Sequence, residues 1–272
     1  MKAYIREPEI SAAASSDSAP PVVTLRGVGK AFAIGVVALA RLDIVVRSGE
    51  FVSLLGPSGC GKSTALRLIA GLTDPTCGVN EWRAPRGAND RGSRAIGFVF
   101  QEPTLMPWAT VAANVRLPLK LQGRAASAQP RIDAALSRVG LSGFAHSYPR
   151  ELSGGMKMRA SIARALVTEP RLLLMDEPFA ALDEITRFRL NDDLLALWQS
   201  LGKTVVFVTH SVFESVYLSQ RVVVMTPRPG RVFTELAIDA PYPRDESFRT
   251  SATYAAYCRR VSEAFARAMD EP

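Results

Sequence analysis

The sequence element that most constrains the fold is "GPSGCGKST" at residues 56–64, which follows the apolar run "FVSLL" and precedes "ALRLIAGL". It fits the pattern G-x-x-x-x-G-K-[ST], in which glycines let the backbone curl so that successive N–H groups point at phosphate oxygens. The pattern requires a buried strand before it and a helix after it, and both flanks have the matching hydrophobic spacing. We therefore expect a phosphate ligand at this loop rather than a chance glycine-rich turn.

Three residues at the end of this loop have predicted roles. The Lys62 ammonium can reach the β- and γ-phosphates of a nucleotide, and the Ser63 hydroxyl can take a Mg²⁺ position. Thr64 lies in the first helical turn, where a free backbone N–H can meet the α-phosphate. The residues expected to hold the nucleotide are Gly56, Pro57, Ser58, Gly59, Cys60, Gly61, Lys62, Ser63 and Thr64.

Four further apolar runs, at about residues 96–101, 171–178, 203–210 and 221–225, are predicted strands. Helical stretches lie between several of them, which favours a mostly parallel sheet covered on both faces. Ligands of such sheets bind at the carboxyl ends of the strands. Polar residues end three of the runs, namely Gln101, Asp176 with Glu177, and His210. Together with the phosphate loop they predict one shared site.

The adjacent carboxylates Asp176 and Glu177 end an apolar strand, where they are costly unless they hold a metal or take part in chemistry. Neighbours in a strand point to opposite faces, so we expect the two side chains to have different roles. Asp176 fits a Mg²⁺ partner, directly or through water, and Glu177 fits the base that polarises an attacking water. His210 fits a sensor of the γ-phosphate, and Gln101 fits a contact to the metal or the water.

Composition divides the chain into three predicted parts. Residues 1–21 are biased toward Ala, Ser and Pro without an apolar signal region, and are expected to be a flexible extension. Residues 22–240 are expected to form one phosphate-binding domain, with an extra β layer near its start and an inserted helical subdomain at about 102–165. Residues 241–272 are expected to form a short C-terminal helical extension, whose apolar stripe indicates core packing.

The charge and the cysteines limit the class of protein. The net charge of +7 suits either a solvated arginine-rich surface or attraction to nucleic acid or an anionic membrane face. The basic residues are scattered, and no stripe of alternating basic and aromatic residues stands out. Three cysteines without metal-ligand spacing, no secretion signal and no apolar run of membrane-spanning length indicate a reducing cytosolic compartment.

A second stretch, "LSGGMKMRASIARAL" at residues 152–166, also suits an anion at a helix N-terminus. Ser153, Gly154 and Gly155 stand just before an amphipathic run. The chain therefore has two phosphate-binding devices, about ninety residues apart.

The ordered motifs resemble those of the ATP-binding subunits of ABC transporters. These are the Walker A loop "GPSGCGKST", Q-loop "VFQE", signature "LSGGM", Walker B "LLLMDE", D-loop "ALD" and switch "VTH", which span about residues 25–232. The wider wording "DEPFAALDEITRFRLNDDLLALW" is similar to the nitrate/sulfonate/taurine importers, a group that includes pyrimidine-type systems. The resemblance implies an α/β fold: a P-loop NTPase ABC cassette with a mostly parallel core sheet, an antiparallel β subdomain and an inserted helical subdomain.

The resemblance also implies a head-to-tail homodimer with two ATP molecules at its interface, each held between the Walker A loop of one copy and the signature of the other. Ser153, Gly154 and Gly155 would then contact the ATP of the other copy, and Asp183 would cross the interface. Phe32 matches the position of an aromatic ring that stacks on adenine. Met156 stands where glutamine is most common, although the importer group commonly has methionine there.

The activity implied is Mg²⁺-dependent ATP hydrolysis that energises a transporter, with the chain peripheral on the cytoplasmic face of a bacterial inner membrane. The implied partners are permease subunits and, indirectly, a solute-binding protein, with no nucleic acid. The cargo could be a small anion, a sulfonate or a pyrimidine-like solute. The positive charge keeps open a non-transport ABC ATPase acting on nucleic acid or the ribosome. A metabolic P-loop kinase is the third hypothesis, but it gives no reason for the LSGG stretch.

Overall fold

Among the residues that the structure describes (19–33, 35–83, 95–124 and 128–271 of a computed structural model), a sheet of six strands lies at the centre of the fold. The strand order is β5-β6-β7-β3-β8-β9, and only β9 runs antiparallel to its neighbour. The strands are β3 (Phe51–Leu55), β5 (Ile96–Val99), β6 (Leu172–Asp176), β7 (Thr204–Thr209), β8 (Arg221–Met225) and β9 (Val232–Ala237). The predicted mostly parallel sheet is confirmed. Its central strands are buried along their whole length because helices cover both faces.

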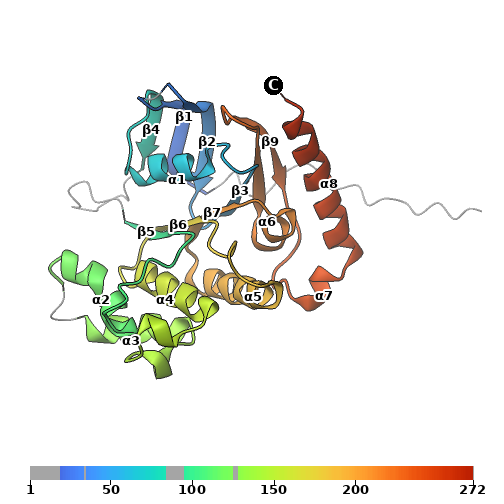
Figure 1. Cartoon of the computed structure of the whole chain (residues 1–272). Helices are drawn as coiled ribbons and strands as arrows, with labels where there is room; N and C mark the ends of the chain where they lie inside the picture. Colours follow the sequence, from blue (N-terminus) through green and yellow to red (C-terminus); the bar gives the residue numbers. More distant parts are fainter. Residues whose placement is uncertain (1–18, 34, 84–94, 125–127, 272) are drawn as a thin grey trace, which may run out of the picture.

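Helix α1 (Lys62–Ala70) follows β3 and covers one face of this sheet, where it shares a core with an antiparallel sheet in the order β2-β1-β4 (Figure 1). These strands are β1 (Pro21–Ala31), β2 (Val37–Arg47) and β4 (Cys77–Trp82). The predicted antiparallel subdomain is confirmed, and β1 begins one residue before the expected start of the domain. The sequence did not predict β4, because "CGVNEW" has no apolar alternation and its residues are mostly exposed. The strand forms by pairing with β1.

The inserted segment is helical, as expected. Helices α2 (Val111–Leu121), α3 (Gln129–Arg138) and α4 (Gly154–Leu166) pack together on the opposite face of the core sheet from α1, where α5 (Glu184–Leu201) also lies (Figure 1). The Arg164 guanidinium of α4 donates to the carbonyls of Pro103 and Thr104, both at 2.7 Å. This contact fixes the segment after Gln101 against the helical subdomain.

The C-terminal residues pack against the core sheet and share a hydrophobic core with it. Helix α6 (Val212–Leu218), α7 (Glu246–Arg249) and α8 (Ala252–Met269) follow β7 and β9, and α8 lies along α6 and β8. The predicted apolar stripe of α8 is in this core, with Val261 fully buried and Tyr257 4% exposed. A bilayer crossing takes a long helix of apolar residues, and the helices among the described residues include none of that kind.

Candidate nucleotide-binding site

The phosphate loop lies between β3 and α1 at the carboxyl edge of the core sheet. Gly61 precedes α1 with a φ of 106°, a conformation that L side chains rarely adopt. A Cβ at this position would also lie 2.7 Å from the side chain of Leu39, so glycine is required for both conformation and space. The β2 strand therefore packs directly against the loop.

The Lys62 ammonium joins the phosphate loop to a carboxylate. Its Nζ donates to the carbonyls of Gly56 at 2.7 Å and Pro57 at 2.9 Å. The same Nζ lies 3.3 Å from Oε1 of Glu177, and the Lys62 side chain is 3% exposed. This buried cation is available to the phosphates that the curled loop would surround.

The two carboxylates at the end of β6 have different partners in the structure. Ser63 Oγ donates to Asp176 Oδ1 at 2.8 Å. Burial raises the pKa of Asp176, and the hydrogen bond from Ser63 partly opposes that shift. Glu177 is not in the strand, contrary to the sequence argument, because β6 ends at Asp176 and Glu177 has a left-handed φ of 44°. Such a strained conformation is characteristic of functional sites, and here it directs the carboxylate toward Lys62 and His210.

His210 lies beside Glu177, with Nδ1 3.2 Å from Glu177 Oε2. The backbone around the histidine is supported by Thr209, whose hydroxyl accepts from the Ser211 N–H at 2.9 Å and donates to Glu214 Oε2 at 2.6 Å. Glu214 was not predicted as a support of this site. It lies five residues after Thr209, in the first turn of α6, which follows β7 directly.

The loop, strand ends and aromatic residue surround one pocket of about 380 Å³. Phe32, in the hairpin after β1, is 41% exposed and lies at this pocket. The predicted residues that line it are Phe32, Ser58, Gly59, Gly61, Lys62, Ser63, Thr64, Gln101 and Glu177. Four further predicted residues do not line the pocket but contact residues that do. Gly56 and Pro57 contact Lys62, Asp176 contacts Ser63, and His210 contacts Glu177. Cys60 is buried within the loop itself, 1% exposed.

The second stretch predicted to bind phosphate, at residues 152–166, lies outside this pocket. Ser153 caps α4 by accepting from the Met156 N–H at 3.3 Å. A Cβ at Gly155 would lie 2.8 Å from the side chain of Thr186, in the first turn of α5. Asp183 caps α5 by accepting from the Thr186 N–H at 2.9 Å, and this bond lowers the pKa of Asp183. The structure thus groups Ser153, Gly154 and Gly155 with Asp183 and not with Lys62.

Three pocket residues were not predicted from the sequence: Val36, Ala38 and the charged Arg228, which lies in the turn after β8. Its Nε and Nη2 both donate to the Gly59 carbonyl at 3.0 Å. A signal was present, because "TPRPGR" follows the fifth predicted strand in the same way that the other polar residues follow theirs.

The oxygen donors near the loop suit Mg²⁺. Ser63 and Asp176 provide a hydroxyl and a carboxylate within hydrogen-bonding distance of each other, and Gln101 provides an amide oxygen at the same pocket. Mg²⁺ typically takes one or two protein ligands together with substrate phosphates and waters. Among the described residues, no group of three or more His, Cys, Asp or Glu side chains is arranged to hold a metal ion by itself. Binding of Mg²⁺ together with phosphates and waters does not require such a group.

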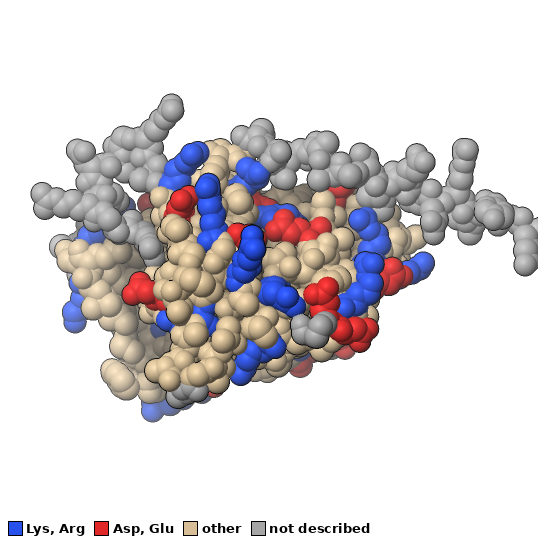
Figure 2. Space-filling view, turned by 90° about the horizontal axis from the view of Figure 1, so that it is seen from above, with Lys and Arg blue, Asp and Glu red and all other residues tan. Residues whose placement is uncertain are grey.

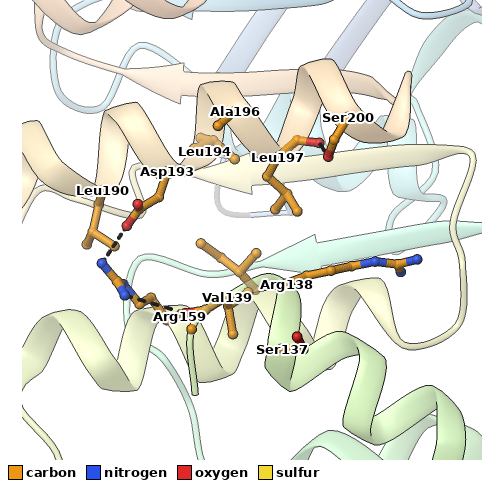
Figure 3. Close-up of a pocket in the computed structure, with 12 residues that line it drawn as sticks. Ser137, Arg138, Val139, Arg159, Leu190, Asp193, Leu194, Ala196, Leu197 and Ser200 are labelled. Atoms are coloured by element: carbon orange, nitrogen blue, oxygen red, sulfur yellow. Dashed lines mark hydrogen bonds and ion pairs between the residues drawn. The ribbon is translucent and has the colours of Figure 1, made fainter. Parts of the chain in front are cut away.

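Two other surface features lie apart from this site. A hollow of about 450 Å³ separates α3 and α4 from α5, and Arg159 donates to Asp193 across it (Figure 3). None of the predicted site residues lines this hollow. On the face shown in Figure 2, Lys and Arg side chains are spread out, with Asp and Glu between them.

Comparison with known proteins identifies the family. The family described as ABC transporter matches residues 39–180, more than half of the chain. The chain belongs to this family, as an ATP-binding subunit. It is 47% identical over 222 residues to the nitrate import ATP-binding protein NrtD of Synechocystis, covering 80% of this chain and 81% of that protein. It is 42% identical over 229 residues to the aliphatic sulfonates import ATP-binding protein SsuB of Bacillus licheniformis, covering 84% and 86%.

Solved structures of ABC cassettes have the same fold. The cbiO1 protein of Clostridium perfringens, part of the transporter complex cbiONQ, aligns with a TM-score of 0.70 and 27% identity over 80% of this chain and 89% of that one. A dimeric cassette, MJ0796, bound to ADP and Pi in a post-hydrolysis state, aligns with a TM-score of 0.67 and 34% identity over 80% and 100%. These ABC relatives confirm the resemblance to nitrate and sulfonate importers, and this ABC subunit is an ATPase.

Proposed function

We propose that two copies of this ABC subunit enclose two ATP molecules head to tail and drive a membrane importer. The observation that carries the proposal is the separation of Lys62 from Ser153 within one chain. The pocket at Lys62 has no signature residue among its lining, and the N-terminus of α4 stands beside Asp183 instead. Each copy therefore has two separate half-sites for phosphate, one at Lys62 and one at Ser153. This arrangement favours a dimer in which each half-site of one copy is completed by the other half-site of the second copy.

Hydrolysis in this arrangement depends mainly on positioning and charge. The phosphate-loop N–H groups and Lys62 would hold the β- and γ-phosphates, while Phe32 stacks on adenine. Glu177 would accept a proton from the water that attacks the γ-phosphorus, as the bond to the β-phosphate oxygen breaks to give ADP and phosphate. His210, 3.2 Å from Glu177, would orient that carboxylate and contact the γ-phosphate.

Closure around ATP would involve the second copy's signature. The Ser153 hydroxyl and the N–H groups of Gly154 and Gly155 stand at the positive end of the α4 dipole, which favours the γ-phosphate of the other copy's ATP. Asp183, which accepts from the N–H of Thr186 beside Gly155, would cross the same interface. Mg²⁺ held by Ser63, Asp176 and Gln101 would neutralise charge on the phosphates.

A transport role is supported by the segment after Gln101. Trp108 is 77% exposed on this segment, which begins at the nucleotide pocket and ends at α2. An exposed tryptophan there offers a permease subunit a contact that would move with Gln101. We propose that the chain binds permease subunits from the cytoplasmic face of a bacterial inner membrane, with a solute-binding protein as the indirect partner. The named relatives support a small anion or a sulfonate as cargo, with a pyrimidine-like solute as a further candidate.

The test of the dimer is a mixing experiment with Lys62→Ala and Ser153→Arg subunits. Each variant alone damages both sites of its own dimer. The mixed dimer holds one doubly damaged site and one intact site, so ATP-dependent dimers and part of the ATPase activity should return on mixing. Light scattering after size-exclusion chromatography measures the dimer, and phosphate release measures the turnover.

Failure to recover either signal on mixing would contradict completion of the site by a second copy. Circular dichroism of each variant checks that its fold is retained. Glu177→Gln provides the control for chemistry, because it should keep ATP-dependent dimers while lowering turnover of the assembled transporter by at least about a hundredfold.

A further inference from the structure

The turn after β8 is built against the phosphate loop. Thr226 Oγ1 accepts from the Arg231 N–H at 3.1 Å, and the Thr226 N–H donates to the Arg231 carbonyl at 3.0 Å, so residues 226–231 form a closed loop. A Cβ at Gly230 would lie only 2.0 Å from the Cys60 carbonyl oxygen. The absence of a side chain at Gly230 is what allows this turn to approach the phosphate loop.

The same turn also holds the hairpin that carries Phe32. The Gly230 N–H donates to the Ala38 carbonyl at 3.0 Å, and the Ala40 N–H donates to the Gly230 carbonyl at 3.0 Å. Gly230 thus joins three parts of the pocket: the phosphate loop, the start of β2 and the turn itself. Arg228 stands at the centre of this junction.

Arg228 binds the phosphate loop with only two of its three guanidinium nitrogens. Its Nε and Nη2 both donate to Gly59 O at 3.0 Å, whereas Nη1 donates to none of the described residues. The side chain is exposed and lines the pocket together with Phe32 and Thr64. An arginine held in this way keeps its positive charge and has at least one donor that no described residue uses.

Sheet order indicates which end of the nucleotide Arg228 faces. Glu177 and His210 follow β6 and β7, on one side of the loop-bearing strand β3. Arg228 follows β8, on the other side of β3. With Glu177 and His210 assigned to the γ-phosphate, as proposed above, Arg228 faces the opposite end of the nucleotide, the end assigned to Phe32.

We propose that Arg228 is a further ATP-binding residue, which holds Gly59 in place and donates from Nη1 to the α-phosphate or ribose of the nucleotide. A guanidinium suits this place because a phosphate oxygen and ribose hydroxyls are all acceptors. The proposal rests on this pocket being the ATP site of the subunit, and it needs neither the dimer nor the permease.

The test compares Arg228→Gln, Arg228→Lys and the control Arg26→Gln by calorimetric titration with ATP and with ADP. Arg26 is a 68% exposed arginine of β1, so the control loses the same charge away from the pocket. We expect Arg228→Gln to weaken ATP and ADP binding by the same factor, about tenfold, because both nucleotides share the ribose and α-phosphate. KM should rise by a similar factor with kcat nearly unchanged, as for uniform binding of ground and transition states.

Arg228→Lys keeps the charge but not the planar fork, so its dissociation constants should lie between those of the wild type and Arg228→Gln. If Arg228→Gln does not fold, the dissociation constants of Arg228→Lys test the proposal instead. Unchanged affinity for both nucleotides in both variants would overturn the proposal. So would a loss confined to ATP, which would assign Arg228 to the γ-phosphate, or an equal loss in Arg26→Gln. Failure of the wild type to bind ATP would instead contradict the site itself.

Discussion

Glu214 is a buried carboxylate close to His210. Its side chain accepts from Thr209 at 2.6 Å, and its other oxygen lies 3.8 Å from Arg187 Nε, too far for a hydrogen bond. Among the described groups, that oxygen and Arg187 Nε are both buried without a hydrogen-bond partner. Burial therefore raises the pKa of Glu214, although Thr209 and Arg187 oppose the shift.

This raised pKa predicts a pH-dependent stability. The folded protein binds the Glu214 proton more tightly than the unfolded chain, whose ordinary value is 4.5, so the free energy of unfolding should fall as pH rises above about 4.5. Glu214→Gln stays neutral and keeps an acceptor for Thr209. The stability of the wild type relative to this variant should therefore decrease between pH 4.5 and 7, measured by urea unfolding. A difference that is constant with pH would contradict this, and Glu263→Gln on the exposed face of α8 is the control.

The three cysteines differ in exposure, and this predicts their reactivity. Cys60 and Cys258 are 1% and 7% exposed, whereas Cys77 is exposed on β4. Burial raises the pKa of the Cys60 thiol, and that of Cys258 to about 11. Because the thiolate is the reactive form, N-ethylmaleimide at pH 7 should label Cys77 first, giving one adduct by peptide mass spectrometry. Labelling of Cys60 at a similar rate would show that the phosphate loop opens, and urea-unfolded protein should label at all three.

At the scale of elements, the loop before α2 depends on one buried side chain. Asn114 is fully buried and accepts from the Met106 N–H at 2.7 Å. Its amide nitrogen has two hydrogens, which it shares among three carbonyl oxygens, those of Met106, Ala109 and Thr110. The contacts of this one side chain thus shape the segment that exposes Trp108.

Asn114→Ala should loosen this loop while leaving the nucleotide pocket intact. The loss leaves buried backbone groups without partners, at a cost of about 2 kcal/mol in the free energy of unfolding. Amide hydrogen exchange at residues 106–110 should rise, and stimulation of ATPase activity by a permease should fall with ATP affinity unchanged. Lys120→Ala, on the exposed side of α2, is the matched control. Unchanged exchange at 106–110 would contradict the assigned role of Asn114.

At the scale of the whole molecule, Arg244 joins the C-terminal extension to the domain. The residue is 4% exposed, and its Nη1 donates to the carbonyls of Val216, Tyr217 and Ser219 at 2.8, 2.9 and 2.9 Å. Its Nη2 donates to two carbonyls near the end of β9. Because this one charged donor bonds carbonyls of the core domain, we expect residues 241–271 to unfold together with the core sheet.

Arg244→Ala should therefore destabilise the entire domain. Five carbonyls lose their donor, and we expect the free energy of unfolding to fall by about 3 kcal/mol. Urea denaturation followed by tryptophan fluorescence should show an earlier single transition, because α8 and the core unfold together. An unchanged midpoint, or a separate early transition of α8, would contradict this integration. Arg259→Ala on the exposed face of α8 should leave the midpoint unchanged.

The phosphate loop, the parallel strands and the polar residues at their ends were all predictable from the amino-acid sequence. These features are local, because the loop pattern is contiguous and Gln101, Asp176 and His210 each follow an apolar run. The rule that parallel strands present their carboxyl ends at one edge then predicts that these residues lie together. The order of the motifs was sufficient to predict an ABC ATPase.

Tertiary structure alone decided which distant residues support that site. Arg228 and Gly59 are separated by 169 residues, and only the pairing of β8 with β3 brings them together. The left-handed turn at Glu177, the pairing of β4 with β1 and the carbonyls around Arg244 likewise depend on contacts between separate elements. Hydrophobic periodicity records which face of an element is buried, but not which neighbour covers it. The position of Ser153 beside α5 was therefore available only from the fold.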